Sequence, residues 1–332
     1  MMGEIASIAS RLWQVSPAEI GWGLASSPVV CAAGAVVLAL IVARVRRRPG
    51  GASAAGADRE RVALGALALM VGAAWLADVV LRGYVFDMSA TVSWWRFAVA
   101  PLVATGGLVV LGASLRAGGA RRAVDALSVT RRTWTTFGPR RELVALVTLA
   151  ALTGAIVVVF GTTAMSLDSG VSAHVALDAP NTAYAPVVLP FPGWAYGIPT
   201  ISALMLVIAA TVFALHRNSV RPFRGGLGWD EERSRRAMTA RGLVAVALAA
   251  TLLALAGLLR MARAAVLTSM TFAHSGETVN VSVPHEDLIV LGGMLAPVLE
   301  ISGAVVLALL VIRAGELVAP GRRLARTAGS AA

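Results

Sequence analysis

The carboxylate of Glu300 is the side chain in this sequence that most needs a chemical explanation. It lies twelve residues after Leu288, where a long apolar run begins. At about 1.5 Å per helical residue, this spacing puts the carboxylate about 18 Å into a membrane, near the middle of the bilayer. A charge at that depth is costly and usually marks an ion or proton route. Glu300 is therefore predicted to be a transport or proton-responsive group. A protonated carboxyl that hydrogen-bonds across a helix contact is the structural alternative.

Two further residues extend this candidate site. Pro297 lies one turn before Glu300, where it frees a backbone carbonyl and can bend the helix. Small residues share the helical face of Glu300 and favour close helix packing: Gly293, Ala296, Gly303 and Ala304. Asp78 is the second acidic candidate, near the end of another apolar run. Its simpler interpretation is an ion pair with Arg82 at the i+4 position, or a side chain that reaches the membrane surface.

Three histidines form a second candidate site, of a different chemical kind. His174, His274 and His285 are all predicted on one side of the membrane, with Glu277 close to them in sequence. Three imidazoles and a carboxylate could bind zinc or copper. No ligand-spacing motif supports the site, because the residues come from two separate connections. Ordinary histidines in surface loops are the alternative.

The composition indicates what kind of protein must position these residues. The chain has 332 residues, of which 57% are hydrophobic and 14% charged, and its mean hydropathy is +0.76. Soluble domains carry about 25% charged residues. No alternating barrel pattern occurs, so helices are the expected way to cross the bilayer. We expect an all-α, polytopic transmembrane helical bundle with seven spans, at about 24–43, 62–81, 97–115, 143–163, 197–215, 242–259 and 288–312.

The arginines predict the orientation of these spans. The connections after the first, third and fifth spans, together with the C-terminal tail, hold 24 of the 29 arginines. The positive-inside rule then puts the N-terminus outside and the C-terminus in the cytoplasm. This distribution also explains the net charge of +11 without nucleic acid as a partner. The bilayer is the expected partner, and the Arg-rich, Lys-free composition favours a bacterial cytoplasmic membrane.

The remaining segments are predicted from local patterns. Residues 1–23 are interpreted as an amphipathic N-terminal segment, 24–315 as the membrane domain and 316–332 as a basic cytoplasmic tail. The charged run 231–236 is interpreted as a solvated part of the fifth connection. Alternating polar and apolar residues predict a short, half-buried strand at 278–283.

Three functions are compatible with these patterns. The first is a permease or conduit that uses Glu300. The second is a non-catalytic membrane subunit or scaffold that binds partner membrane or envelope proteins. The third is a membrane enzyme with a metal site at the outer histidines. The chain has no lysine, so it cannot form a retinal Schiff base.

Overall fold

The computed structural model describes most of the chain, in segments separated by gaps. The described residues are 16, 21, 23, 27–45, 55–86, 88, 91–115, 138–167, 170–177, 186–221, 229–267, 270–274, 277–281, 283 and 285–329. The side chains of 55–58, 229, 270–274, 277–281 and 317–329 are not part of the description. The amphipathic segment predicted at 1–23 therefore lies almost entirely outside the described residues.

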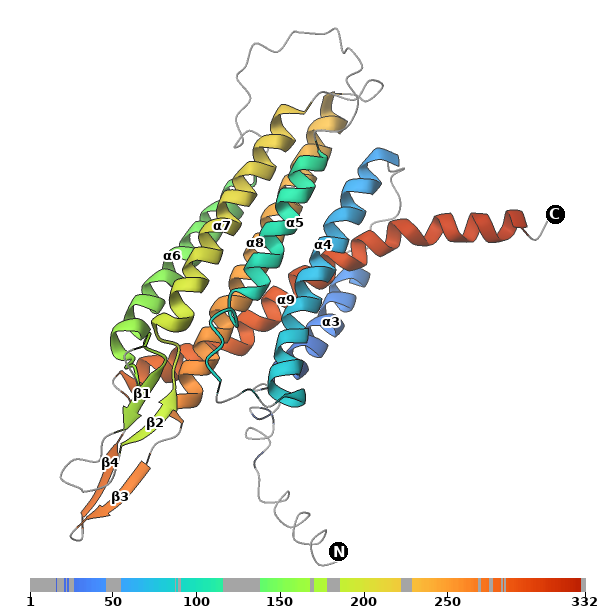
Figure 1. Cartoon of the computed structure of the whole chain (residues 1–332). Coiled ribbons are helices and arrows are strands. Elements are labelled where there is room, and N and C mark those ends of the chain that lie inside the picture. The colour runs from blue at the N-terminus through green and yellow to red at the C-terminus, as the bar shows by residue number, and fades with distance from the viewer. Residues whose placement is uncertain are drawn as a thin grey trace, which may run out of the picture.

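Helices dominate the described part of the chain and run up and down as a bundle (Figure 1). They are α3 (Pro28–Val45), α4 (Ala55–Val80) with a π-helical turn at Leu81–Val85, α5 (Val99–Ser114), α6 (Arg140–Thr163), α7 (Trp194–Val220), α8 (Trp229–Val266) and α9 (Glu286–Gly329). Within the described residues, six helices are long and apolar enough to cross a membrane, and α5 is a shorter apolar helix of 16 residues. This is the architecture of a multi-pass membrane protein, as the composition predicts.

Two short antiparallel hairpins add β-structure that the all-α prediction does not include. β1 (His174–Leu177) pairs with β2 (Val187–Pro190), and β3 (Met270–His274) pairs with β4 (Glu277–Val281). β4 confirms a strand close to the predicted 278–283, starting one residue earlier. Both hairpins lie at one end of the bundle, called here the hairpin end (Figure 1). The opposite end, where α5 and α7 end and α6 and α8 begin, is called the arginine-rich end.

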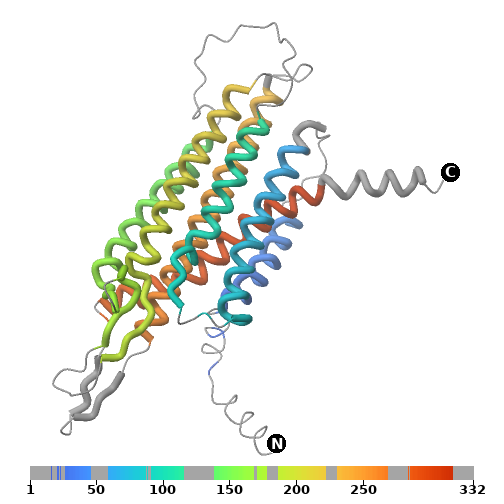
Figure 2. Tube along the Cα trace, viewed as in Figure 1, coloured from blue at the N-terminus to red at the C-terminus, as the bar shows by residue number. Residues whose placement is uncertain are grey.

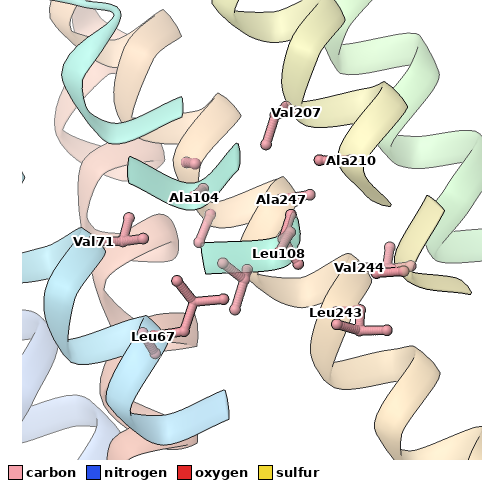
Figure 3. Close-up of a cluster of buried hydrophobic side chains, with 14 of the residues drawn as sticks. Leu67, Val71, Ala104, Leu108, Val207, Ala210, Leu243, Val244 and Ala247 are labelled. Carbon is pink, nitrogen blue, oxygen red and sulfur yellow. The ribbon is translucent and has the colours of Figure 1, made fainter. Parts of the chain in front are cut away.

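A compact apolar core fills the half of the bundle toward the arginine-rich end. Its buried members come from α4, α5, α6, α7, α8 and α9, and they include Val71, Ala104, Leu108, Val207, Leu243 and Ala247 (Figure 3). These side chains are small or branched, so the helices approach closely and leave the outer faces apolar toward lipid. Trp75 packs on the edge of this core, and the bundle is less densely filled beyond it, toward the hairpin end.

α9 lies diagonally across the bundle and contacts α3, α4 and α8 (Figure 2). Glycines permit these crossings. A Cβ added at Gly303 would lie 3.1 Å from the carbonyl oxygen of Ala249 in α8. A Cβ added at Gly65 in α4 would overlap the side chain of Ala314 in α9. The small-residue face predicted around Glu300 is thus a helix contact, and it brings α9 against α8.

Candidate functional site

Glu300 forms an ion pair with Arg260 of α8. Arg260 Nε donates to Glu300 Oε1 at 2.9 Å, and Arg260 Nη2 donates to Oε2. Glu300 is only 2% exposed, whereas the Arg260 side chain is 22% exposed. Two parallel hydrogen bonds of this kind are typical of an arginine that binds a carboxylate. Arg260 is thus a charged partner of Glu300 that the sequence pattern around Glu300 did not predict.

The sequence did not reveal Arg260 because the sixth span was predicted to end one residue before it. In the structure, α8 continues to Val266, so Arg260 lies inside the helix and opposite Glu300. Gly303 lies one turn beyond Glu300 and allows α8 and α9 to approach closely enough for the pair to form. The thiol of Cys31 in α3 lies 3.9 Å from Arg260 Nη2 and completes the packing around the guanidinium.

A cavity of about 320 Å³ lies beside this ion pair, on the hairpin side of the apolar core. It is bounded by α4, the start of α5, the second half of α8, α9 and the end of β2. Its charged lining residues come from four parts of the chain: Asp78, Arg96, Arg260 and Glu300. Most of the other lining residues are apolar, among them Trp75 and Phe97. The structure therefore brings together the two predicted acidic residues and two arginines that the prediction did not use.

Asp78 and Arg82 form the ion pair predicted from their spacing. Arg82 Nη2 donates to Asp78 Oδ1 at 3.0 Å, and Arg82 is only 6% exposed. The Nε and Nη1 atoms of Arg82 are also buried, with no hydrogen-bond acceptor among the described residues. A buried guanidinium with unused donors is costly, and its positive charge acts on Arg96, which lines the cavity.

Arg96 precedes α5 and is held by neutral groups. Its Nη1 lies 3.9 Å from Met261 Sδ, and its guanidinium lies 5.3 Å from the centre of the Phe97 ring. No carboxylate among the described residues lies within ion-pair distance of it, although the charge of Asp78 also acts on it. Burial lowers the pKa of the Arg96 guanidinium, and the nearby charge of Arg82 lowers it further. An arginine nevertheless stays protonated in proteins, so the positive charge remains at the cavity wall.

Pro297 is buried within α9, which continues as a helix on both sides of it. Proline has no backbone N–H, so the carbonyl of Gly293 loses its helical hydrogen bond. A Cβ added at Gly293 would overlap the side chain of Arg263, so the aliphatic part of Arg263 covers this turn. Pro297 thus marks a weakened point of α9 one turn from Glu300.

The histidines predicted to bind a metal lie in different places. His174 is in β1 and lines one cavity, whereas His285 precedes α9 and lines another. His274 and Glu277 are directly opposed in the β3–β4 hairpin, but their side chains lie outside the description. Among the side chains that the structure does describe, no group of three metal ligands is found. The metal site therefore stays a prediction.

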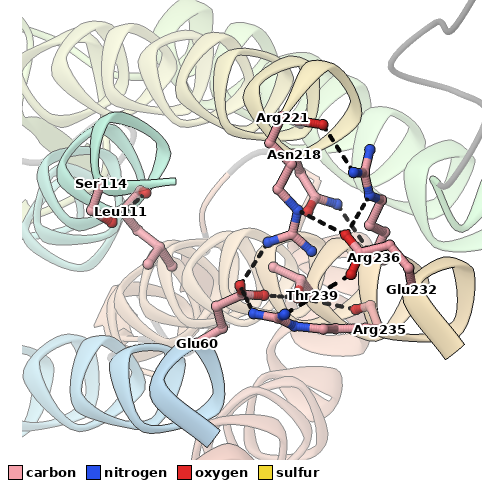
Figure 4. Close-up of polar contacts among 9 residues, drawn as sticks. All are labelled: Glu60, Leu111, Ser114, Asn218, Arg221, Glu232, Arg235, Arg236 and Thr239. Atoms are coloured by element: carbon pink, nitrogen blue, oxygen red, sulfur yellow. Dashed lines mark hydrogen bonds and ion pairs between the residues drawn. The ribbon is translucent and has the colours of Figure 1, made fainter. Parts of the chain in front are cut away.

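A second cluster of charges lies at the arginine-rich end, and the sequence interpretation missed it (Figure 4). Glu60 of α4 is its centre. Glu60 Oε1 accepts hydrogen bonds from Arg221 Nη1 at 2.6 Å and from Arg235 Nη2, and Oε2 accepts one from the Thr239 hydroxyl at 2.7 Å. These contacts join α4 to the end of α7 and to the start of α8. With Glu232 and Arg236, this set is called the Glu60 network.

Glu232 and Arg236 correct the interpretation of 231–236 as a solvated run. α8 begins at Trp229, so the two residues are one turn apart in a helix, and they are 1% and 0% exposed. Arg236 Nε donates to Glu232 at 2.9 Å, while its Nη1 and Nη2 donate to the carbonyl oxygens of Ser219 and Arg221. The first carbonyl lies in the last turn of α7 and the second directly after it, where acceptors lack helical partners. The i, i+4 spacing of Glu232 and Arg236 was the signal in the sequence.

Comparison with known proteins returns no relative: no family model matches the chain, and no curated protein or solved structure matches it significantly. Any function must therefore be argued from the two charge clusters and the cavity themselves.

Proposed function

We propose that the protein is a permease or conduit that moves a small solute across a bacterial cytoplasmic membrane. The supporting observation is the cavity of about 320 Å³ beside Glu300, where charged side chains meet inside an otherwise apolar bundle. Charged residues at such positions are costly and commonly line substrate or ion pathways. The cavity also lies between helices, where ligand sites in bundles are often found.

The two ends of the bundle differ in a way that suits this function. The cavity lies on the hairpin side of the bundle, whereas the apolar core and the Glu60 network fill the arginine-rich end. Transporters expose their binding space to one side of the membrane at a time. We propose seven spans with the N-terminus outside, so that the cavity faces outward and the Glu60 network forms the closed inner end.

Within this function, Glu300 acts through Arg260. The carboxylate of Glu300 holds the Arg260 guanidinium at the cavity wall by two hydrogen bonds and compensates its positive charge. Glu300 is therefore a positioning residue, and Arg260 is the group that meets the solute. Arg260, and not the Glu300 carboxylate, is therefore the proposed contact with the solute.

Filling the cavity tests the proposal directly. Ala264 lines the cavity and is exposed, so Ala264→Trp adds a large ring in open space. Ala151 is an exposed residue of α6 and does not line the cavity, so Ala151→Trp is the matched control. Purified protein is reconstituted into liposomes, and stopped-flow light scattering follows the entry of small neutral and charged solutes, with valinomycin and potassium for the anions.

We expect the wild-type protein and Ala151→Trp to speed the entry of at least one solute over protein-free liposomes. Ala264→Trp should remove most of that increase while eluting as a folded protein in gel filtration. Permeation no faster than in protein-free liposomes for every solute contradicts the proposal. So does full activity in Ala264→Trp.

A further inference from the structure

We propose that the cavity beside Glu300 binds a small organic anion, with its carboxylate or phosphate group at Arg96 and Arg260 and its apolar part against Trp75 and Phe97. The inference names the substrate class of the proposed permease and rests on that function for its physiological meaning. The binding itself is argued from contacts that do not depend on transport.

The charges around the cavity do not balance. Arg96, Arg260, Asp78 and Glu300 are the charged residues of the lining, and Arg82, which does not line the cavity, adds a third arginine through its ion pair with Asp78. Each carboxylate is paired with one arginine, and Arg96 is the cation with no carboxylate partner in that set. Water screens such a charge poorly inside an apolar bundle, so the excess attracts an anion.

The contacts of Arg96 leave it suited to an added anion. A thioether at 3.9 Å and an aromatic face at 5.3 Å are weak partners for a guanidinium with five N–H donors. Met261, which holds Arg96, is the neighbour of Arg260 in α8, so both guanidinium groups are anchored at the same turn of one helix. Carboxylates and phosphates are the groups that guanidinium donors bind most strongly.

The size and the apolar lining define the rest of the ligand. About 320 Å³ is at the lower end of the range for small-molecule sites, which starts at about 300 Å³. Trp75 and Phe97 offer aromatic surface for an apolar body. The ligand is thus a small amphiphilic anion. A water-soluble carboxylate and the phosphate of an anionic lipid share this chemistry, and the experiment separates them.

Isothermal titration calorimetry in an uncharged detergent tests the site with benzoate as the probe and benzyl alcohol as its uncharged analogue. Arg96→Gln removes the unbalanced charge. Arg241→Gln is the matched control, because Arg241 is an exposed residue on the same helix as Arg260, at the arginine-rich end. The double variant Arg260→Gln/Glu300→Gln removes the ion pair as a unit, so that no buried charge is left alone.

We expect benzoate to bind more tightly than benzyl alcohol, and Arg96→Gln and the double variant to weaken benzoate by about 10-fold or more. Arg241→Gln should bind as the wild type does. The inference is overturned if benzoate and benzyl alcohol bind alike, or if Arg96→Gln binds benzoate as tightly as Arg241→Gln does.

Nanodiscs identify the source of the anion. If an anionic lipid occupies the site, benzoate should bind about 10-fold more weakly in discs with phosphatidylglycerol than in discs of phosphatidylcholine, and Arg96→Gln should abolish that difference. Equal affinity in both lipids assigns the site to a soluble anion. Benzoate binding without solute flux would remove the proposed transport function and keep this inference. Flux of neutral solutes without benzoate binding would do the reverse.

Discussion

Replacing Glu60 by glutamine should cause a large loss of stability, although Glu60 is far from the cavity. Glu60, Arg221 and Arg235 are each at most 8% exposed, so water compensates little of the charge that the substitution leaves behind. In the wild type, Glu60 and Glu232 face three arginines of the Glu60 network. In Glu60→Gln, Glu232 alone faces all three.

The contacts of Glu60 set the size of the effect. Two charge-assisted hydrogen bonds, from Arg221 and Arg235, are worth about 1.5–3 kcal/mol each. Both arginines keep a longer contact with Glu232, at 3.9 Å, which recovers part of the loss. Burial lowers the pKa of Arg221 and Glu60 opposes this shift, but the guanidinium cannot escape the penalty by losing its proton. We expect a loss of about 3–4 kcal/mol, within the range for breaking buried ion pairs.

The loss can be measured as the free energy of unfolding in mixed micelles with increasing SDS, followed by circular dichroism. Glu231→Gln is the matched control, because Glu231 is exposed and adjoins the buried Glu232. It should change stability by no more than about 0.5 kcal/mol. Glu60→Gln/Arg235→Gln should recover part of the loss, because it removes one of the uncompensated charges. If Glu60→Gln is within 1 kcal/mol of Glu231→Gln, the network does not stabilise the fold as argued.

Two further predictions concern the helix crossings and the topology. Gly65→Val should destabilise the protein by about 2 kcal/mol or more in the same assay, because its Cβ would overlap Ala314. Gly154→Val is the control and should be tolerated, because no atom lies within 4 Å of a Cβ added there. Equal effects of the two variants would contradict the packing argument. In a Cys31→Ser background, a cysteine at 230 should react with an impermeant maleimide only from the cytoplasmic side of sealed vesicles, and one at 170 only from the outer side. The reverse pattern would invert the proposed topology.

Many of the helices could be predicted because the hydropathy of consecutive residues is enough to recognise a membrane span. Each apolar run is long enough to require a helix in a bilayer, and six of the described helices meet that criterion. The Asp78–Arg82 ion pair could be predicted for the same reason, because a spacing of four residues brings two side chains together on one helix face. The position of Glu300 inside a long apolar helix could also be predicted, because it depends on one helix alone.

The missed residues depend on contacts between distant parts of the chain. Arg260 meets Glu300 across 40 residues, and Glu60 meets Arg235 across 175. A hydropathy window treats each such charge as the end of a span, because it scores the residue and not its partner. This is why Arg260 fell just beyond the sixth span, and why Glu232 and Arg236 were interpreted as solvated. Charge pairs that close a bundle become visible only once the helices are placed side by side.

The course of α9 has a mechanical consequence. Beyond Glu300 the helix is held in place by Gly303 against α8 and by Ala314 against Gly65 of α4. Before Glu300, Pro297 removes a hydrogen bond from the helix. A bend at Pro297 would let the part of α9 toward the hairpin end rotate relative to the fixed part beyond Glu300. That segment lines the separate cavity next to α6 at Leu288, Ile289 and Gly292, which could then change shape while the opposite end of the bundle stays in place.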